Sequence, residues 1–350
     1  MSPRVRIACI CCLLALPVLA AAAPTAYTVT PVAGKFTAAV DLNNAGQVAV
    51  NNLGTDVPFR MGSISDGTTS ESIGTLGGAE SFIHGLNNRG EAVGQSSTAA
   101  GVNHAFVYAG GRMRDLTVDH GLDSAVALND SGDIAGQVGE RAAVLRADGT
   151  LDVFGPPSSR SAAINGAGDV AGYHAAPGAG DHAFLYAGGV FGDLGTPGGS
   201  YSVAASLNDA GAVVGYGFTA WAQQHAFLHD GAGLIDLAPS SAFSAAADIN
   251  NRASIVGTMD GRAFRYADGA LIDLNTLLGP DAQFLLTAAV AINDQEQILA
   301  RACDPTGTFC VSAVRLDPIP AIPEPRGALL LLAGAALLAA RAAGARRGRS

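Results

Sequence analysis

Three histidines at equivalent positions of a recurring octet have the spacing most suggestive of chemistry. "HAFVYAGG" begins at His104, "HAFLYAGG" at His182 and "HAFLHDGAG" at His225. If equivalent positions met on a common axis, their imidazole nitrogens could form a three-nitrogen zinc or iron site. The alternative is a structural histidine that bonds a backbone or hydroxyl partner. We expect the structural role, because the octet is better explained as a strand displaced from such an axis.

The octets belong to seven copies of one unit. Strings of the form "SLNDAGAVVG" recur along the chain, and their asparagines stand 36 to 44 residues apart. The aligned asparagines are Asn43, Asn87, Asn129, Asn165, Asn208, Asn250 and Asn293. This period predicts one repeated architecture from residue 27 to residue 317 and leaves no room for a separate catalytic domain.

Each unit contains four short β-like segments. In the copy that begins at residue 201 they are "YSVAASLN", "AVVGYG", "HAFLH" and "GLIDLA". A turn joins the first two segments, in which Asn208 can bond its own backbone and Gly211 accepts positive φ. Turn chemistry therefore explains the repeated asparagine without a ligand.

The polarity of the strands favours blades that pack face to face. In "HAFLY", alternation puts Phe184 and Tyr186 on one face and Ala183 and Leu185 on the other, so both faces are apolar. Four strands in each of seven units of about 42 residues predict an all-β, seven-bladed β-propeller-like ring. An open β-solenoid is the alternative architecture.

The ends of the repeat region predict how the ring closes. The last unit stops at "SAVRLD", the position of a third strand, so it lacks a fourth. Near the start of the mature chain, "YTVTPVAG" matches the position of a fourth strand, and we expect it to complete the last blade. Small residues such as Gly172 and Gly215 recur where strands would crowd toward the axis.

A family resemblance is carried by "HAFLY", "DLGTPGG" and "LNDAGAVVG". These strings resemble the HAF repeat, an extracellular bacterial repeat often found in exported proteins with a PEP-CTERM end. The leading histidine is kept in three units, whereas Arg262 and Ala142 replace it in two others. The resemblance covers most of residues 27–317 and implies architecture and location better than activity.

Both ends of the chain carry predicted targeting segments. Residues 1–23 resemble an N-terminal signal helix, because Arg4 and Arg6 precede an apolar run that ends in small residues. The repeats at 24–317 are followed by a linker at 318–326, a hydrophobic transmembrane helix at 327–345 and a basic tail at 346–350. A plain C-terminal anchor helix is one interpretation of this end.

The C-terminal segment resembles the PEP-CTERM sorting signal of Gram-negative bacteria. The resemblance lies in the Pro-Glu-Pro triplet, the hydrophobic helix and the basic residues, which are Pro323, Glu324, Pro325, Arg341, Arg346, Arg347 and Arg349. It implies processing by an exosortase-type enzyme near the triplet and transient anchoring in the inner membrane. Delivery would then be to the cell surface or the exopolysaccharide matrix.

Charge and acidic turns limit the partners and cofactors. Residues 24–325 hold all 30 Asp and Glu but only 13 of the 20 Lys and Arg, which argues against a nucleic-acid partner. The turns "NDSGD" at 129–133 and "NGAGD" at 165–169 place carboxylates beside glycine. They lack the D-x-D-x-D-G spacing of a calcium loop, so we expect no cofactor beyond weakly bound calcium.

Two cysteines remain once the signal segment is removed. Cys303 and Cys310 are separated by "DPTGTF", which can turn the chain back, and an exported protein meets oxidising conditions. We therefore expect a disulfide between them. Two cysteines alone cannot make a four-ligand zinc site.

The chain shows no G-x-S-x-G, H-E-x-x-H or P-loop motif, so we expect no enzymatic activity. Trp221, the sole tryptophan, stands in "FTAWAQQ" and could stack on a sugar ring, although we expect it to pack on its own blade. The predicted function is a surface or matrix component that binds exopolysaccharide or a surface protein. The alternative is an extracellular hydrolase or lyase with its active site in the propeller funnel.

Overall fold

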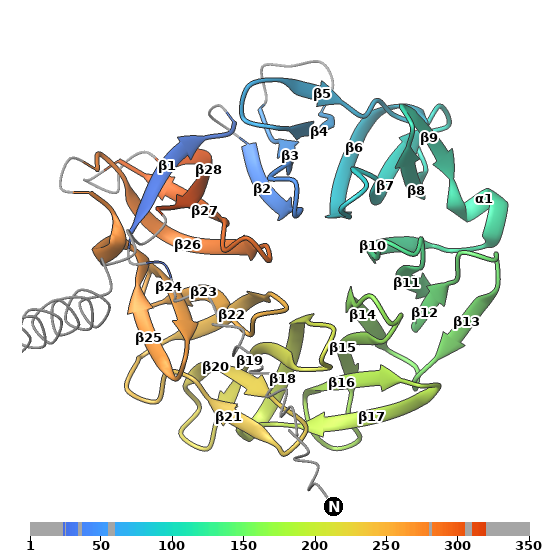
Figure 1. Ribbon diagram of the computed structural model, residues 1–350. Helices are drawn as coiled ribbons and strands as arrows, with labels where there is room; N and C mark the ends of the chain where they lie inside the picture. Colours follow the sequence, from blue (N-terminus) through green and yellow to red (C-terminus); the bar gives the residue numbers. More distant parts are fainter. Residues whose placement is uncertain are drawn as a thin grey trace, which may run out of the picture. The chain divides into compact units, whose positions relative to one another are not determined.

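The computed structural model describes residue 24 and residues 26–33, 37–54, 60–279, 282–304 and 310–319. These residues form seven four-stranded sheets arranged as blades around an axis (Figure 1), so the predicted seven-bladed propeller is confirmed. Within the described residues, no helix is long and apolar enough to cross a membrane. The predicted signal helix, sorting triplet, transmembrane helix and basic tail lie outside the described residues.

Blades 1 to 3 follow the chain from the innermost strand outward. Blade 1 contains β2 (Thr37–Leu42), β3 (Val48–Asn52), β4 (Gly62–Ser65) and β5 (Ser70–Ser72). Blade 2 contains β6 (Gly77–Leu86), β7 (Ala92–Thr98), β8 (Asn103–Ala109) and β9 (Arg112–Asp115). The helix α1 (Leu116–His120) leads to blade 3, which contains β10 (Ser124–Leu128), β11 (Ile134–Val138), β12 (Arg141–Leu145) and β13 (Leu151–Phe154).

Blades 4 to 6 repeat this order. Blade 4 contains β14 (Ser159–Ile164), β15 (Val170–Ala175), β16 (Asp181–Ala187) and β17 (Val190–Gly195). Blade 5 contains β18 (Gly198–Leu207), β19 (Val213–Thr219), β20 (Gln224–His229) and β21 (Leu234–Asp236). Blade 6 contains β22 (Ser244–Ile249), β23 (Ile255–Met259), β24 (Arg262–Ala267) and β25 (Ala270–Asp273), and the 3-10 helix η1 (Leu274–Leu277) follows it.

Blade 7 combines the two ends of the repeat region. It contains β26 (Leu285–Ile292), β27 (Ile298–Cys303) and β28 (Cys310–Pro318), and its fourth strand is β1 (Tyr27–Pro31). β1 pairs antiparallel with β28 from Tyr27 opposite Pro318 to Pro31 opposite Val314. The predicted closure of the ring by the N-terminal strand is confirmed. Because β1 completes blade 7, that blade has four strands like the other six.

Every blade has two ends that differ in their connections. At one end, which we call the turn end, a tight turn joins the first and second strands. Residues 208–211 form this turn between β18 and β19. The opposite end, which carries the connections from second to third strand and from one blade to the next, is the loop end. Gly211 has a φ of 78°, as the turn prediction requires.

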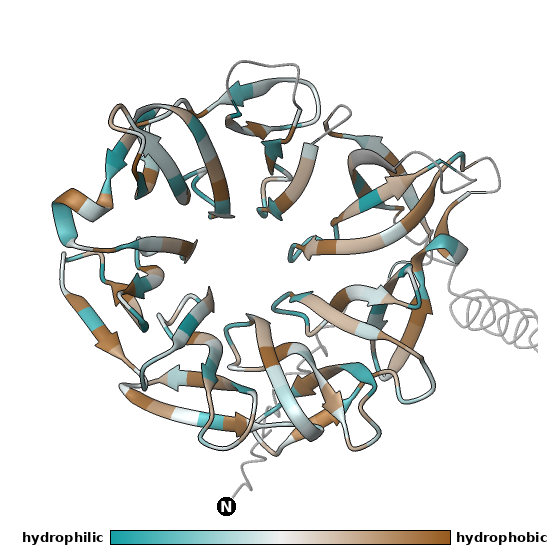
Figure 2. Ribbon diagram, turned by 180° about the vertical axis from the view of Figure 1, so that it is seen from behind, coloured by the Kyte–Doolittle hydropathy of each residue, from teal (hydrophilic) through white to brown (hydrophobic). Residues whose placement is uncertain are grey.

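The repeated Ala-Phe dipeptide packs adjacent blades together. Phe184 and Tyr186 contact residues of blade 3, such as Val144, whereas Ala183 and Leu185 face blade 5. The four equivalent phenylalanines are fully buried: Phe106, Phe184, Phe227 and Phe264. Figure 2 shows brown, hydrophobic stretches on the strands of every blade. The predicted burial of both strand faces is confirmed.

The repeated glycine of the second strand has a different role from the one predicted. Gly172 and Gly215 lie on β15 and β19, and the innermost strands β14 and β18 stand between them and the axis. The inner strand approaches so closely that a Cβ at Gly172 or Gly215 would overlap the carbonyl oxygen of Arg160 or Val203. The close approach of the inner strand's backbone, one strand away from the axis, requires glycine at these two positions.

Candidate functional site

The three octet histidines do not converge on the axis. Each begins or nearly begins the third strand of its own blade and bonds an aspartate eleven residues later on the fourth strand. His104 Nδ1 lies 2.7 Å from Asp115, and His225 Nδ1 lies 2.7 Å from Asp236. His182 Nδ1 lies 3.1 Å from Asp193. This geometry joins two strands of one blade, and the His-to-Asp spacing was the sequence signal for it.

The unit with arginine in place of histidine preserves the same contact. Arg262 Nη1 lies 3.3 Å from Asp273, again eleven residues away. In blade 2, burial alone would raise the pKa of Asp115, but hydrogen bonds from His104 and from the N–H of Val118 outweigh it and lower that pKa. In these four blades the position therefore supplies a donor to a carboxylate, and either side chain does so. In blade 3 the equivalent residue is Arg141 and not the predicted Ala142, and its Nε donates to the oxygen of Gly155 at 2.9 Å.

The acidic turns at 129–133 and 165–169 each join the first and second strands of a blade. Across the described ranges, no group of three or more His, Cys, Asp or Glu side chains could hold a metal ion. Asp133 accepts from Arg146 at 3.3 Å and from the N–H of Ala147 at 2.9 Å. The Asp169 carboxylate accepts the side-chain amide of Asn165 at 3.2 Å and the N–H of Gly188 at 3.3 Å. Both carboxylates thus already accept hydrogen bonds from the protein.

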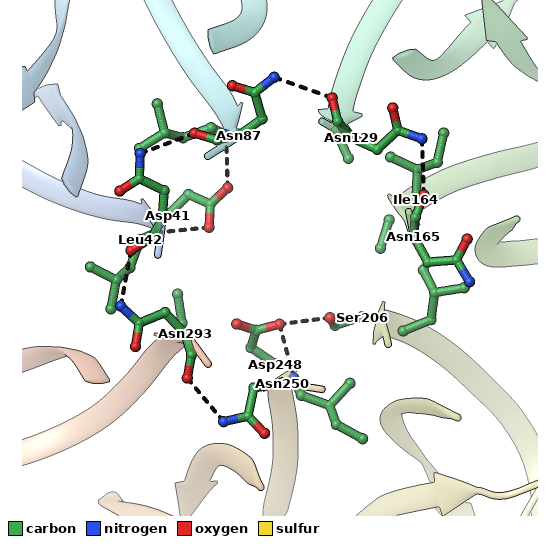
Figure 3. Close-up of a pocket in the computed structure, with 18 of the residues that line it drawn as sticks. Asp41, Leu42, Asn87, Asn129, Ile164, Asn165, Ser206, Asp248, Asn250 and Asn293 are labelled. Atoms are coloured by element: carbon green, nitrogen blue, oxygen red, sulfur yellow. Dashed lines mark hydrogen bonds between the residues drawn. The ribbon is translucent and has the colours of Figure 1, made fainter. Parts of the chain in front are cut away.

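The seven repeated asparagines form a continuous hydrogen-bonded ring at the turn end. Each side-chain Nδ2 donates to the backbone oxygen of the equivalent asparagine in the next blade, at 2.9 to 3.3 Å (Figure 3). The last bond runs from Asn293 to Asn43 and closes the circle. Each Asn side chain is buried, and its Oδ1 accepts N–H groups of its own turn, as for Asn208. Bonds within its own turn thus explain only one role of the repeated asparagine; the other role is the bond to the next blade.

The inner strands enclose a central channel of about 340 Å³ that contains two aspartates the sequence analysis did not select. Figure 3 shows Asp41 of blade 1 and Asp248 of blade 6 projecting into it. Burial raises the pKa of Asp41 to about 6 and that of Asp248 to about 7, and the charge of Asp41 adds to the latter shift. The signal was an aspartate two residues before the repeated asparagine, present in two of the seven units.

Both channel aspartates bridge neighbouring blades. Asp41 accepts the N–H of Leu42 in its own strand and that of Leu86 in blade 2, each at 2.8 Å. Asp248 accepts the N–H of Ile249 at 2.9 Å and that of Ile292 in blade 7 at 2.8 Å. The hydroxyl of Ser206 donates to Asp248 at 2.6 Å. All four carboxylate oxygens therefore accept main-chain hydrogen bonds, which ties them to the ring.

Trp221 lies at the loop end and does not pack on its own blade, so that expectation was wrong. The indole is 85% exposed in the connection between β19 and β20. The reason is local. The loop folds back on Thr219, whose hydroxyl accepts the backbone N–H of Trp221 at 3.3 Å, and this leaves the Trp221 side chain outside the blade.

The predicted disulfide partners lie opposite each other in blade 7. Cys303 ends β27 and stands directly across the ladder from Cys310, the first residue of β28. Cys303 is disulfide-bonded.

Comparisons with known proteins identify the fold. No family model and no curated protein match the sequence. The β-propeller domain of the Trilobed protease from Pyrococcus furiosus has a TM-score of 0.56 at 12% identity, with 81% of this chain and 97% of that chain covered. YCF48 bound to D1 peptide has a TM-score of 0.54 at 9% identity, with 87% and 98% covered.

A third solved structure, the acylaminoacyl peptidase of Pyrococcus horikoshii, has a TM-score of 0.54 at 10% identity, and the match covers 80% of this chain and 50% of that one. At such identities the likeness shows the fold alone. The Pyrococcus furiosus domain is described as having an open velcro topology. The present chain is a seven-bladed β-propeller whose ring is closed by the pairing of β1 with β28.

Proposed function

We propose that this protein is an exported, non-enzymatic binding component of the cell surface or extracellular matrix, with exopolysaccharide as its partner. The proposal takes its location from the sequence, in which an export-like segment at 1–23 and the Pro323-Glu324-Pro325 triplet flank HAF-type repeats. Processing by an exosortase-type enzyme would release the chain after transient anchoring in the inner membrane. A surface protein is the other partner that we considered.

The observation that carries the non-enzymatic assignment is the use of the channel carboxylates. Asp41 and Asp248 each accept main-chain N–H groups on both oxygens, from their own strand and from the next blade. A general acid or base must exchange a proton with substrate, which here would break the bonds that join the blades. The exposed loop end is therefore the better surface for a partner.

Binding and location can be tested on the full chain, produced with its own export signal. We expect recovery outside the cell, a mass that indicates cleavage near Pro323, and co-sedimentation with matrix polysaccharide purified from the producing cells. Retention in the cytoplasm, or failure to sediment with any polysaccharide fraction, contradicts the proposal.

A hydrolase or lyase is the second candidate, and one observation favours it. The pKa values of about 6 and 7 for Asp41 and Asp248 lie in the range useful for acid and base catalysis near neutral pH. Depolymerisation of matrix polysaccharide by the wild-type chain, abolished by Asp41→Asn or Asp248→Asn, would establish this activity. The binding proposal predicts no depolymerisation by any of the three proteins.

A further inference from the structure

The loop end of blades 5 and 6 carries the most exposed large apolar side chain among the described residues. Trp221 is 85% exposed, and Phe243, in the connection from blade 5 to blade 6, is 43% exposed. The two loops are adjacent, because Gln224 and Phe243 form a parallel bridge. Two aromatic residues thus reach solvent from neighbouring loops, and apolar side chains that gather on one exposed surface often mark a binding site.

The loop that carries Trp221 is braced by hydrogen bonds to Thr219. Thr219 is buried, and its hydroxyl accepts the N–H groups of Trp221 at 3.3 Å and Gln223 at 3.4 Å. Its backbone N–H donates to the oxygen of Gln223 at 2.9 Å, and its oxygen accepts from Ala222 at 2.9 Å. The indole is therefore presented on a fixed backbone, which lowers the entropy lost on binding.

The loop that carries Phe243 is held from both sides. The N–H of Phe243 donates to Asp260 Oδ1 at 3.0 Å, and its oxygen accepts the N–H of Asp260 at 2.9 Å. On the blade 5 side, His225 Nε2 lies 3.1 Å from the oxygen of Ser241, while its Nδ1 bonds Asp236. One of the octet histidines therefore positions the loop that displays the second aromatic residue.

The two loop segments that carry the aromatic residues contain no charged side chain. Residues 219–224 and 238–243 contain no Asp, Glu, Lys or Arg, although the exported region as a whole is acidic. Gln223 is exposed, and neither its side-chain amide nor that of Gln224 bonds another described residue. The carboxylate of Asp260, which belongs to the next loop of blade 6, accepts the N–H groups of Ala242 and Phe243. Such a surface suits a ligand that has hydroxyl groups and no charge.

We propose that Trp221 and Phe243 form a binding surface for a neutral polysaccharide, an inference that rests on the proposed function and names its site. The apolar C–H face of a pyranose stacks on the indole, and the amides of Gln223 and Gln224 bond the hydroxyl groups at its rim. The loops present an open surface, so the surface contacts sugars within a chain as readily as terminal ones. Contacts to several chains of a matrix would add by multivalency.

The sole tryptophan of the chain is Trp221, so intrinsic tryptophan fluorescence reports on this surface alone. The probes are dextran and a soluble neutral β-glucan, each added to the full chain. We expect at least one of them to shift the Trp221 emission to the blue and to protect the indole from acrylamide quenching. A polyuronate of similar length is expected to bind less well, since the loops lack cationic groups.

Substitutions then separate the site from the proposed function. Trp221→Ala is expected to weaken co-sedimentation with the bound glucan about 10-fold or more, Trp221→Tyr to restore part of it, and Phe243→Ala to have a smaller effect. Val190→Ala is the matched control, because Val190 is 69% exposed at the opposite end of blade 4 and should leave binding unchanged. Equal thermal unfolding of all variants confirms that they fold.

Three results would overturn the inference. If wild-type and Trp221→Ala chains bind polysaccharide equally, the surface is wrong while the proposed function stands. If the wild-type chain binds no polysaccharide, the proposed function fails together with the surface. If Trp221 is protected from quenching by a purified surface protein and by none of the polysaccharides, the surface binds a protein and not a sugar.

Discussion

The two ends of the propeller use their side chains differently. At the turn end, all seven units place an asparagine in the same blade-to-blade hydrogen bond, and two units add an aspartate that bridges to the next blade. At the loop end the connections diverge: one is the short link between β11 and β12, another is the Trp221 loop, and a third is the helix α1. The repeated residues therefore build the ring, and the divergent ones are available to a partner.

The largest contrast is expected between two arginines on the strand β24. Arg265, at the turn end, is 2% exposed and bonds Glu296 of blade 7 at 2.7 Å. Arg262, at the loop end, bonds Asp273 with a half-exposed side chain. We expect Arg265→Ala to lower the free energy of unfolding by about 3 to 5 kcal/mol, because it leaves the Glu296 carboxylate buried and unpaired.

We expect Arg262→Ala to cost below about 0.5 kcal/mol, as for other exposed ion pairs. Urea unfolding of the two variants beside the wild-type chain measures both values. Equal losses would contradict the assignment of structural and exposed roles to the two ends.

The channel aspartates are expected to make stability depend on pH. Their pKa values in the folded chain, about 6 and 7, lie above the unfolded value of 3.8, so the folded state binds more protons between those limits. By linkage, their contribution is fully present below pH 3.8 and is lost as pH rises through 6 and 7, by about 3 kcal/mol for Asp41 and about 4 kcal/mol for Asp248.

The measurement is the free energy of urea unfolding from pH 5 to pH 8, for the wild-type chain and for the double variant Asp41→Asn, Asp248→Asn. The double variant should lose less stability over this range. Parallel curves would show that other groups account for the whole dependence.

Removal of one asparagine from the ring tests the blade-to-blade bond. Asn208→Ala leaves the N–H groups of Ala210 and Ala212 without their acceptor and removes the bond to the Asn250 oxygen, so we expect a loss of about 2 kcal/mol in unfolding free energy. The neighbouring Asp209→Ala, at an exposed position, should cost about 1 kcal/mol or less. A larger loss for Asp209→Ala than for Asn208→Ala would contradict the assignment of the stabilising blade-to-blade bond to the repeated asparagine.

The smallest effect is expected at the octet histidine. His104→Ala removes a partly exposed contact to Asp115 and should cost about 1 kcal/mol. His104→Arg should recover most of that loss, because Arg262 makes the equivalent contact in blade 6. Thermal unfolding of both variants checks this, and an arginine variant less stable than the alanine variant would show that the position requires an imidazole.

The sequence predicted the number of blades, the order of strands and the closure, because those features depend on a repeat period and on apolar strand faces. It did not predict the channel aspartates. Alternation along β2 is broken by a bulge between Ala39 and Asp41, and the extra residue changes which side chains face the axis. A pattern with period two cannot register that shift.

The Trp221 surface shows a second limit of sequence reasoning. Whether a loop aromatic packs on its blade depends on the path of five or six residues, here set by two hydrogen bonds to the Thr219 hydroxyl. The pairing of Gln224 with Phe243 joins segments from two blades, and neither segment carries a repeated motif. Period and polarity carry no information about either contact.

The most direct test of the division between the two ends is glucan binding by the double variant Asp41→Asn, Asp248→Asn, measured beside Trp221→Ala by co-sedimentation at one pH. We predict that the channel variant binds as the wild-type chain does, whereas the Trp221 variant loses binding about 10-fold or more. Loss of binding in the folded channel variant, with binding retained by Trp221→Ala, would contradict the account and place the ligand in the channel.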